Sequence, residues 1–225
     1  MIIVTGGSRG IGKSITEYLV EKGEKVITLS RSKDVNNPNH FSCDITDYES
    51  LKKIYKKLNS DKETIKALIN CAGIASMNLA LTTPPDIIEK VIKTNLLGTI
   101  FCSQIFAPLL IRNKGGRIIN FSTIAVSIGL KGESVYVASK AGVEAFSRVL
   151  SRELSSFNIT VNCIAPGPVK TNLLKGISDE QIKKIIKYQI IEQEMETIDI
   201  VKIVKILLEE DSSKITGQVL HVGGV

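Results

Sequence analysis

The feature that most restricts the fold is the alternation of short apolar strand segments with longer helical patterns. Such alternation is typical of a parallel sheet whose connections cross over its faces. Aromatic residues make up only 5% of the chain, while Ile, Val and Leu dominate its apolar residues, which suits strands buried on both faces. We therefore predict an α/β fold, in which about seven strands form a doubly wound parallel sheet flanked by helices. The strands are expected at Ile2–Val4, Val26–Ser30, His40–Cys43, Ala67–Asn70, Arg117–Phe121, Thr160–Ile164 and Val219–Val222.

Helix boundaries follow from capping residues. Thr46-Asp47-Tyr48-Glu49 is a capping box that opens one helix, Gly23 ends the first helix, and Thr197 is expected to cap the last one. The connection Arg31–Asn39 is too short for a helical crossover, so we expect a loop there. A chain of 225 residues without internal repeats or low-complexity linkers fits one domain, 1–225.

A glycine-rich turn joins the first strand to the first helix. Its sequence is Thr5-Gly6-Gly7-Ser8-Arg9-Gly10-Ile11-Gly12. Glycines let a backbone approach a pyrophosphate closely, and the helix that follows presents unpaired N–H groups and its positive dipole end to the anion. The spacing of these glycines differs from the widespread G-x-G-x-x-G fingerprint. By itself the turn is equally compatible with a cofactor loop and with a plain structural turn.

Tyr136 and Lys140 stand four residues apart in a helical pattern, so a phenol and an ammonium share one helix face. An ammonium favours the phenolate. We therefore predict that Lys140 lowers the pKa of Tyr136 from about 10 toward the range useful for general acid–base chemistry. Tyr and Lys at this spacing are also common on ordinary helix surfaces, so the pair gains its meaning from the rest of the chain.

Five motifs resemble those of the short-chain dehydrogenase/reductase family in identity, order and spacing. They are the glycine turn, Asn70-Cys71-Ala72-Gly73, Asn95, Tyr136-x-x-x-Lys140 and Pro166-Gly167. The tail, Ile215–Gly224, is similar to the family's last strand and closing turn, so the resemblance covers essentially the whole chain. It implies a single NAD(P)-binding Rossmann-fold domain that transfers hydride between a nicotinamide and a carbonyl or secondary alcohol. The nearest members are the 3-oxoacyl-acyl-carrier-protein reductases, which makes a 3-oxoacyl thioester a candidate substrate.

The resemblance assigns four catalytic residues. Tyr136 protonates the developing alkoxide, Lys140 favours the phenolate and binds the nicotinamide ribose, and Asn95 holds a water that links Lys140 to solvent. Thr123 stands where the family usually has serine; its hydroxyl can donate to the substrate oxygen, and its extra methyl narrows the pocket. If Thr123 points away, Ser122 is not expected to replace it, because adjacent strand residues face opposite sides. On sequence alone, Asn95 is as well explained by a helix kink or cap.

The resemblance also implies a set of residues that contact the cofactor. They are Gly6, Gly7, Ser8, Arg9, Gly10, Ile11, Gly12, Arg31, Asp44, Ile45, Asn70, Ala72, Gly73, Tyr136, Lys140, Pro166, Gly167, Val169 and Thr171. Asp44 is expected at the adenine amino group, and its alternative is to cap the helix that follows.

Charge at the end of the second strand favours NADP(H) over NAD(H). In dinucleotide folds an acidic residue about 20 positions past the glycine turn binds the ribose 2′-hydroxyl of NAD, whereas an Arg accommodates the 2′-phosphate of NADP. Here Ser30 and Arg31 occupy that place, and Arg9 supplies a second guanidinium. Guanidinium groups make charge-assisted contacts with phosphate. The alternative for Arg31 is a solvated turn residue.

The segment 172–196 is expected to meet the substrate. Isoleucines at roughly helical spacing form an apolar stripe, with lysines on the wetter side. The stripe consists of Ile177, Ile182, Ile185, Ile186 and Ile190, and the lysines are Lys183, Lys184 and Lys187. A substrate lid and ordinary packing onto the body both explain this pattern.

Family members usually pair two long helices, here Leu97–Arg112 and Tyr136–Leu154, into homodimers or homotetramers. The 3-oxoacyl reductases also dock an acidic carrier protein through basic residues at two positions. Lys114 matches one position, but Phe157 occupies the other, which puts carrier docking in doubt.

Composition excludes several other classes of protein. The 4 cysteines and 2 histidines show no metal-ligand spacing, so no metal is expected. Basic residues exceed acidic ones, 29 to 23, but as scattered lysines that do not indicate a nucleic-acid surface. No uninterrupted apolar run approaches the ~20 residues of a membrane span, and no signal peptide is recognisable, so a cytoplasmic enzyme is expected.

Two other functions stay open. One is a sensor or scaffold that binds NADP(H) without turnover. The other is a nucleotide-sugar epimerase or dehydratase, although those proteins need a longer substrate region than the one that follows Thr171.

Overall fold

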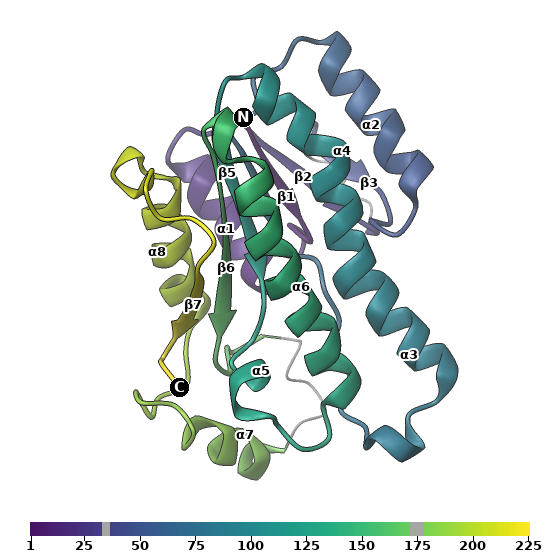
Figure 1. The fold of residues 1–225 in the computed structure, drawn as a ribbon, viewed down its shortest axis with the longest axis vertical. Helices are drawn as coiled ribbons and strands as arrows, with labels where there is room; N and C mark the ends of the chain where they lie inside the picture. Colours follow the sequence, from purple (N-terminus) through teal and green to yellow (C-terminus); the bar gives the residue numbers. More distant parts are fainter. Residues whose placement is uncertain (33–36, 172–177) are drawn as a thin grey trace.

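The strands form one parallel sheet with the start of the chain at its centre (Figure 1). In the part of the chain that the computed structural model describes, residues 1–32, 37–171 and 178–225, the sheet has 7 strands in the order β3-β2-β1-β4-β5-β6-β7. The chain runs outward from β1 through β2 to β3, returns to β4 beside β1, and continues outward to β7. The predicted doubly wound α/β sheet is therefore confirmed.

The strand boundaries agree closely with the prediction, because each buried strand is a local apolar run. The strands are β1 (Ile2–Thr5), β2 (Val26–Ser30), β3 (His40–Ser42), β4 (Ala67–Asn70), β5 (Gly116–Phe121), β6 (Ile159–Pro166) and β7 (Val219–Val222). The predicted ranges of β2, β4 and β7 agree with the structure to the residue, and the other strands differ by one or two residues at one end or, for β6, at both ends.

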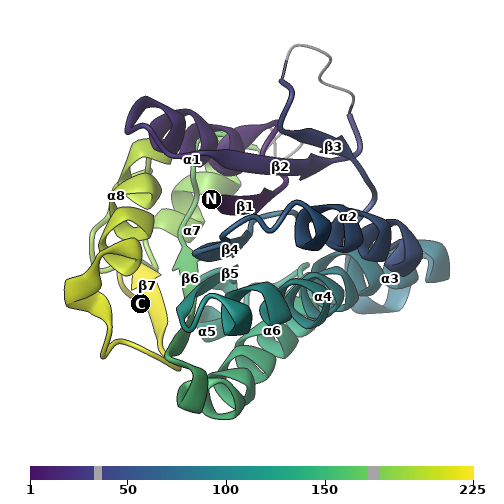
Figure 2. The same cartoon turned by 90° about the horizontal axis from the view of Figure 1, so that it is seen from above.

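Helices cover both faces of the sheet, with α1 and α8 on one face and α2, α4 and α6 on the other (Figure 2). The α-helices are α1 (Gly10–Glu21), α2 (Tyr48–Ser60), α3 (Pro85–Ile92), α4 (Gly98–Arg112), α5 (Ala125–Ile128), α6 (Ser134–Glu153), α7 (Asp179–Ile186) and α8 (Thr197–Leu208). A π-helical segment, η2 (Lys93–Leu97), joins α3 to α4, and short 3₁₀ turns lie at η1 (Ala80–Thr82), η3 (Ser155–Phe157) and η5 (Glu210–Ser212).

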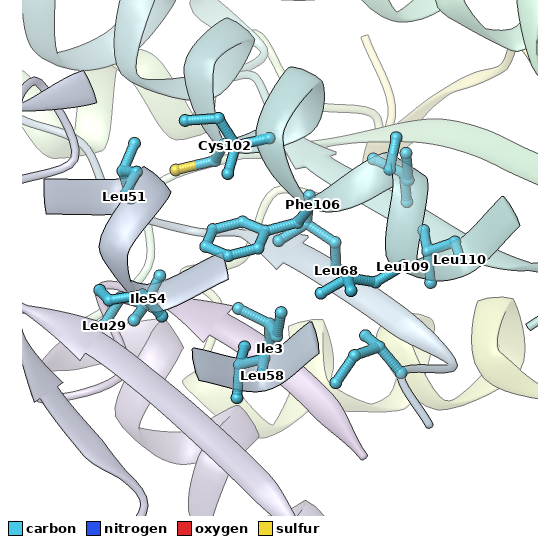
Figure 3. Close-up of a cluster of buried hydrophobic side chains, with 14 of the residues drawn as sticks. Ile3, Leu29, Leu51, Ile54, Leu58, Leu68, Cys102, Phe106, Leu109 and Leu110 are labelled. Carbon is cyan, nitrogen blue, oxygen red and sulfur yellow. The ribbon is translucent and has the colours of Figure 1, made fainter. Parts of the chain in front are cut away.

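The period-two geometry of the strands divides the core into two halves. On β1, Ile2 and Val4 pack in the cluster under α1 and α8, whereas Ile3 packs in the cluster under α2 and α4. The centre of the second cluster is Phe106 of α4, which is fully buried beside Leu68 (Figure 3). Burial of both faces explains why the strands carry continuous apolar runs.

Two predicted helix caps are wrong by one residue. The N-cap of α2 is Asp47, whose side chain accepts a hydrogen bond from the Ser50 N–H, and not Thr46. The N-cap of α8 is Glu196, which forms a capping box with Asp199, while Thr197 is the first helical residue. Before each of these helices, two adjacent polar residues could serve as the N-cap. The direction in which the chain enters the helix decides which of the two does. Gly23 does end α1, with a φ of 81° just after the C-cap.

The connection from β2 to β3 has no helix within its described residues, 31–32 and 37–39, and the remainder of the predicted loop, 33–36, lies outside the described residues.

One helical run is relevant to the prediction that the chain has no membrane span. The helical run Pro85–Arg112 is long and apolar enough to cross a membrane by length and composition, and 56% of its most apolar window is buried inside the protein. That burial is typical of a core helix.

Candidate active site

The predicted site residues gather at the carboxyl ends of the parallel strands. The glycine turn follows β1, residues 71–73 follow β4, Thr123 follows β5, and Pro166–Thr171 end or follow β6. Because β1 and β4 are neighbours whose connections leave in opposite directions, the crevice between them is the place where open α/β sheets bind ligands.

Close backbone contacts hold the glycine turn. A Cβ on Gly6 would lie 2.8 Å from the Ala72 Cα, and one on Gly12 would lie 2.4 Å from the Gly6 carbonyl oxygen. Gly6 and Gly10 also have positive φ values of 71° and 52°. The first turn of α1 contains no acidic residue, and its N-cap, Arg9, makes no side-chain cap. The positive end of the helix is therefore directed at the crevice without a competing carboxylate.

The loop after β4 is fixed by polar contacts. The Ala72 N–H donates to Thr5 Oγ1 over 3.1 Å. The Asn70 side chain, predicted to contact the cofactor, points into the protein, where its Nδ2 donates to Ser103 Oγ and to Asn120 Oδ1. Its Oδ1 is buried and has no hydrogen-bond partner among the described residues. The Asn70 amide therefore braces the ends of β4 and β5.

Tyr136 and Lys140 lie buried on α6, 8% and 6% exposed. Lys140 Nζ donates to the Phe121 carbonyl oxygen at 2.8 Å, which ties the ammonium to the end of β5. The Thr123 side chain hydrogen-bonds the Tyr136 hydroxyl. These contacts bring three of the four predicted catalytic residues together.

Asn95, the fourth, lies in the π-helical segment η2 and is fully buried. Its Oδ1 accepts from the Ile74 N–H at 2.8 Å, and its Nδ2 donates to the Ile74 carbonyl oxygen and to Ser139 Oγ. A Cβ on Gly73 would lie 3.2 Å from Asn95 Oδ1 and 3.4 Å from Lys140 Nζ, so both side chains meet at Gly73. The predicted water bridge from Asn95 stays a prediction. The alternative explanation for Asn95, a distortion of the helix, is confirmed by the π-helical segment η2.

The pKa of Tyr136 is shifted opposite to the prediction. Burial raises it above the ordinary value, the carboxylate of Glu133 raises it further, and the Thr123 hydrogen bond lowers it. Burial also lowers the pKa of Lys140 to about 8. The predicted lowering is wrong because removal from water penalises the charged forms of both residues. Tyr136 is consequently a protonated hydroxyl at neutral pH.

Glu133 is a site residue that the sequence reasoning missed. It precedes α6, one helical turn before Tyr136, and is only 7% exposed. Burial raises the pKa of its carboxyl to about 7. The available signal was an acidic residue one turn before Tyr136, but nothing in the sequence indicated that it is buried.

Ser122 is turned away from the site, as predicted. Its hydroxyl donates to the Glu144 carboxylate on α6, whereas Thr123 Oγ1 accepts from the Ala125 N–H at 3.2 Å. Thr123 is therefore the hydroxyl next to Tyr136.

In the segment after β6, Val169 is buried at 5% exposure, and its own backbone groups take no part in the bridge that flanks it. A bridge to Met195 uses the Pro168 carbonyl oxygen and the Lys170 N–H, which flank Val169. Neither the N–H nor the carbonyl oxygen of Val169 hydrogen-bonds another described residue in this bridge. Thr171 faces the glycine turn, since a Cβ on Gly10 would lie 3.5 Å from its Cβ.

The predicted cofactor residues near the adenosine end differ in exposure. Asp44 is exposed, and its Oδ1 accepts from the Thr46 N–H in the turn before α2. It does not cap that helix, whose N-cap is Asp47, so the capping alternative for Asp44 is wrong. Ile45 is buried against Gly98. Arg31 lines a cavity of about 400 Å³ beside Ile74.

The predicted lid is described only in part, because residues 172–177, which include Ile177, lie outside the described residues. Ile185 is buried, Ile182 and Ile186 are half-buried, and Ile190 is 77% exposed, while Lys183, Lys184 and Lys187 are exposed. Two contacts attach the end of this segment to the rest of the protein. The Gln189 side chain packs against the Gly167 backbone, and the Ile191 N–H donates to the Gly223 carbonyl oxygen. The described part of the segment, 178–196, thus packs onto the body, and whether it opens stays a prediction. No group of side chains that could hold a metal occurs among the described residues.

Known proteins resemble this chain along nearly its whole length. A family model described as short chain dehydrogenase matches residues 1–182. The chain is 34% identical to carbonyl reductase family member 4 of Danio rerio, over 100% of this chain and 96% of that protein. It is 32% identical to a 3-oxoacyl-acyl-carrier-protein reductase of Vibrio harveyi, over 99% of this chain and 95% of that protein.

Solved structures show the same fold with either nicotinamide cofactor. The ligand-free aldohexose dehydrogenase of Thermoplasma acidophilum superposes with a TM-score of 0.89 at 28% identity, covering 99% of this chain and 92% of that one. ElxO with NADP bound gives 0.88 at 27% identity, covering 98% and 96%. A 4-hydroxyisoleucine dehydrogenase complexed with NADH and succinate gives 0.87 at 27% identity, covering 100% and 98%.

Proposed function

The chain belongs to the short-chain dehydrogenase family, and we propose that Tyr136 is its proton donor in NADP(H)-dependent reduction of a carbonyl or oxidation of a secondary alcohol. Membership makes the chain an oxidoreductase with a Rossmann fold that acts on CH–OH or carbonyl groups. One observation carries the proposal: a buried, protonated Tyr136 hydroxyl bonded to Thr123 lies at the sheet edge that also holds the glycine turn.

The crevice fits a dinucleotide. The spaces that a Cβ at Gly6 or Gly12 would fill are already taken by backbone, so at these two positions the turn can offer a pyrophosphate main-chain atoms beside the start of α1. We propose that the nicotinamide end lies at Val169 and Thr171, of which Thr171 lies beside Gly10. When bound, the nicotinamide supplies or accepts the hydride.

The protein's own part is to hold and direct a proton. Burial keeps Tyr136 protonated, so its hydroxyl can donate to a carbonyl oxygen as negative charge develops there. The Thr123 hydroxyl orients that donor. Lys140, with a pKa of about 8, is mostly charged at neutral pH, and its ammonium lies between the Phe121 carbonyl oxygen and Gly73.

Replacing Tyr136 by phenylalanine tests the proton donor. The experiment follows NADPH and NADH oxidation with ketoacyl thioesters, ketones, quinones and keto-sugars, and measures NADPH binding separately. We expect Tyr136→Phe to lose at least ~100-fold in turnover, the lower range for a general acid, while it retains NADPH binding. Tyr18→Phe on α1 is the matched control and should keep full activity. Retained turnover in Tyr136→Phe would contradict the proposal. Wild-type binding without any turnover would favour a sensor or scaffold.

A 3-oxoacyl thioester is the proposed example of the substrate. Lys114 and Phe157, the two positions considered for carrier docking, lie just before β5 and β6, at the sheet edge opposite Tyr136. A carrier docked there could deliver its substrate only to the site of another copy. We accordingly propose that the substrate is a small-molecule carbonyl compound. Delivery of a 3-oxoacyl group by a carrier protein is one form that this substrate could take.

A homodimer or homotetramer in the cytoplasm is proposed from the family resemblance. Leu97, beside α4, and Val149, on α6, are exposed apolar residues that such pairing would cover, at 37% and 55% exposure. Sedimentation velocity would measure the assembly directly.

A further inference from the structure

A cavity beside the crevice has cations on two of its walls. Its volume is about 400 Å³, and its lining includes Arg31 after β2, Ile74 and Ser76 after β4, and Lys90 and Val91 on α3. Arg31 and Lys90 are far apart in the sequence, so the fold alone brings them to one cavity. No carboxylate of the described residues lines this cavity.

The two cations are not neutralised by the residues that the structure describes. Neither Arg31 nor Lys90 forms a salt bridge with a described carboxylate, and Asp86, one helical turn before Lys90, forms none with it. The two positive charges around this cavity repel each other. A dianion bound between them would replace that repulsion with attraction to each cation. Other lining residues suit a nucleoside. Ile74 and Val91 offer apolar surface to a heterocyclic base, and Ser76 offers a hydroxyl group to a sugar.

The cavity adjoins the proposed cofactor crevice at the adenosine end. Ile74 directly follows Gly73, one of the predicted cofactor contacts in the loop after β4. Arg31 follows β2, the strand whose Leu29 carbonyl oxygen accepts from the Gly6 N–H of the glycine turn. In dinucleotide folds the residue at the end of this strand meets the 2′ position of the adenosine ribose.

We propose that Lys90 binds the ribose 2′-phosphate of NADP(H) from the α3 wall of the cavity that Arg31 also lines, and so is a second residue that selects NADP(H) over NAD(H). This inference rests on the proposed function. It adds a specificity determinant on α3 to the arginine predicted from the sequence.

The test is the binding of NADPH, NADH, 2′,5′-ADP and 5′-AMP by calorimetry to Lys90→Gln, Arg31→Gln and the double variant. Lys93→Gln, which changes a lysine that does not line the cavity, is the matched control. Removal of a charge-assisted hydrogen bond to the phosphate should raise the Kd for NADPH and 2′,5′-ADP about tenfold or more in Lys90→Gln. The Kd for NADH and 5′-AMP should stay within about twofold of wild type.

If both cations contact one phosphate, the effects of the single variants on NADPH binding should fail to add in the double variant. Equal changes for NADPH and NADH, or no change for either, in Lys90→Gln would overturn the inference while leaving the proposed function intact. The proposed function itself would fail differently, through absence of binding of any nicotinamide nucleotide to the wild-type protein. Lys90 is exposed on α3, so the variant is expected to fold, and circular dichroism checks this.

Discussion

Replacing Gly6 by alanine separates two reasons for a glycine in the turn after β1. The new Cβ would lie 2.8 Å from the Ala72 Cα and 2.9 Å from its nitrogen. Both are backbone atoms, and the Ala72 N–H is held by Thr5 Oγ1, so the neighbour cannot move aside cheaply. The residue also has a positive φ of 71°, which is strained for any side chain with a Cβ.

The two costs can be estimated separately. The left-handed conformation costs roughly 1–2 kcal/mol for a residue other than glycine. The collision adds about 1–3 kcal/mol, the usual range for overpacking. Gly23→Ala is the matched control, because Gly23 has a φ of 81° but nothing within 4 Å of the position its Cβ would take. It should therefore lose only the conformational cost, of about 1–2 kcal/mol.

Urea unfolding and NADPH titration measure these effects. Gly6→Ala should lose about 2–5 kcal/mol in the free energy of unfolding, the sum of both costs, and should bind NADPH at least about tenfold more weakly because the turn is displaced. Gly23→Ala should bind NADPH like the wild type. If Gly6→Ala is no less stable than Gly23→Ala, the close contact between the turn and the β4 loop does not exist in solution.

Two further predictions concern the core and the buried carboxyl. Phe106→Ala should cost about 3–5 kcal/mol in urea unfolding, because it empties the centre of the cluster under α2 and α4, and a loss below ~1 kcal/mol would contradict that packing. Glu133 has a pKa raised from 4.5 to about 7, so the folded state holds a proton that the unfolded chain releases above pH 4.5. Its carboxyl therefore costs nothing below pH 4.5 and destabilises the fold increasingly as the pH rises to about 7. Glu133→Gln should raise the melting temperature at pH 8 and leave it unchanged at pH 4, whereas an equal effect at both would refute the burial of a charge.

Local patterns predicted most of the fold and the position of the site. A strand buried on both faces is a continuous apolar run, so β2, β4 and β7 could be located to the residue. The glycine turn and the Tyr136 segment were recognisable for the same reason, since short-range backbone conformation and helical spacing depend on neighbours in the sequence.

The caps of α2 and α8 show where local reasoning stops. Thr46 and Asp47 can each accept a hydrogen bond from a helix N–H, and only the path of the chain out of β3 decides between them. The π-helical segment around Asn95 is likewise held by contacts with Ile74, 21 residues away.

What the sequence determined by itself was the α/β architecture and which side chains carry the chemistry, because both are encoded in short-range spacing. Only the tertiary structure decided how those side chains ionise and what they face. It buried Tyr136, Lys140 and Glu133 together and so raised the pKa of the phenol that the isolated pair had suggested would fall. It also brought Lys90 to the cavity of Arg31, since desolvation and charge neighbourhood arise from residues that are distant along the chain.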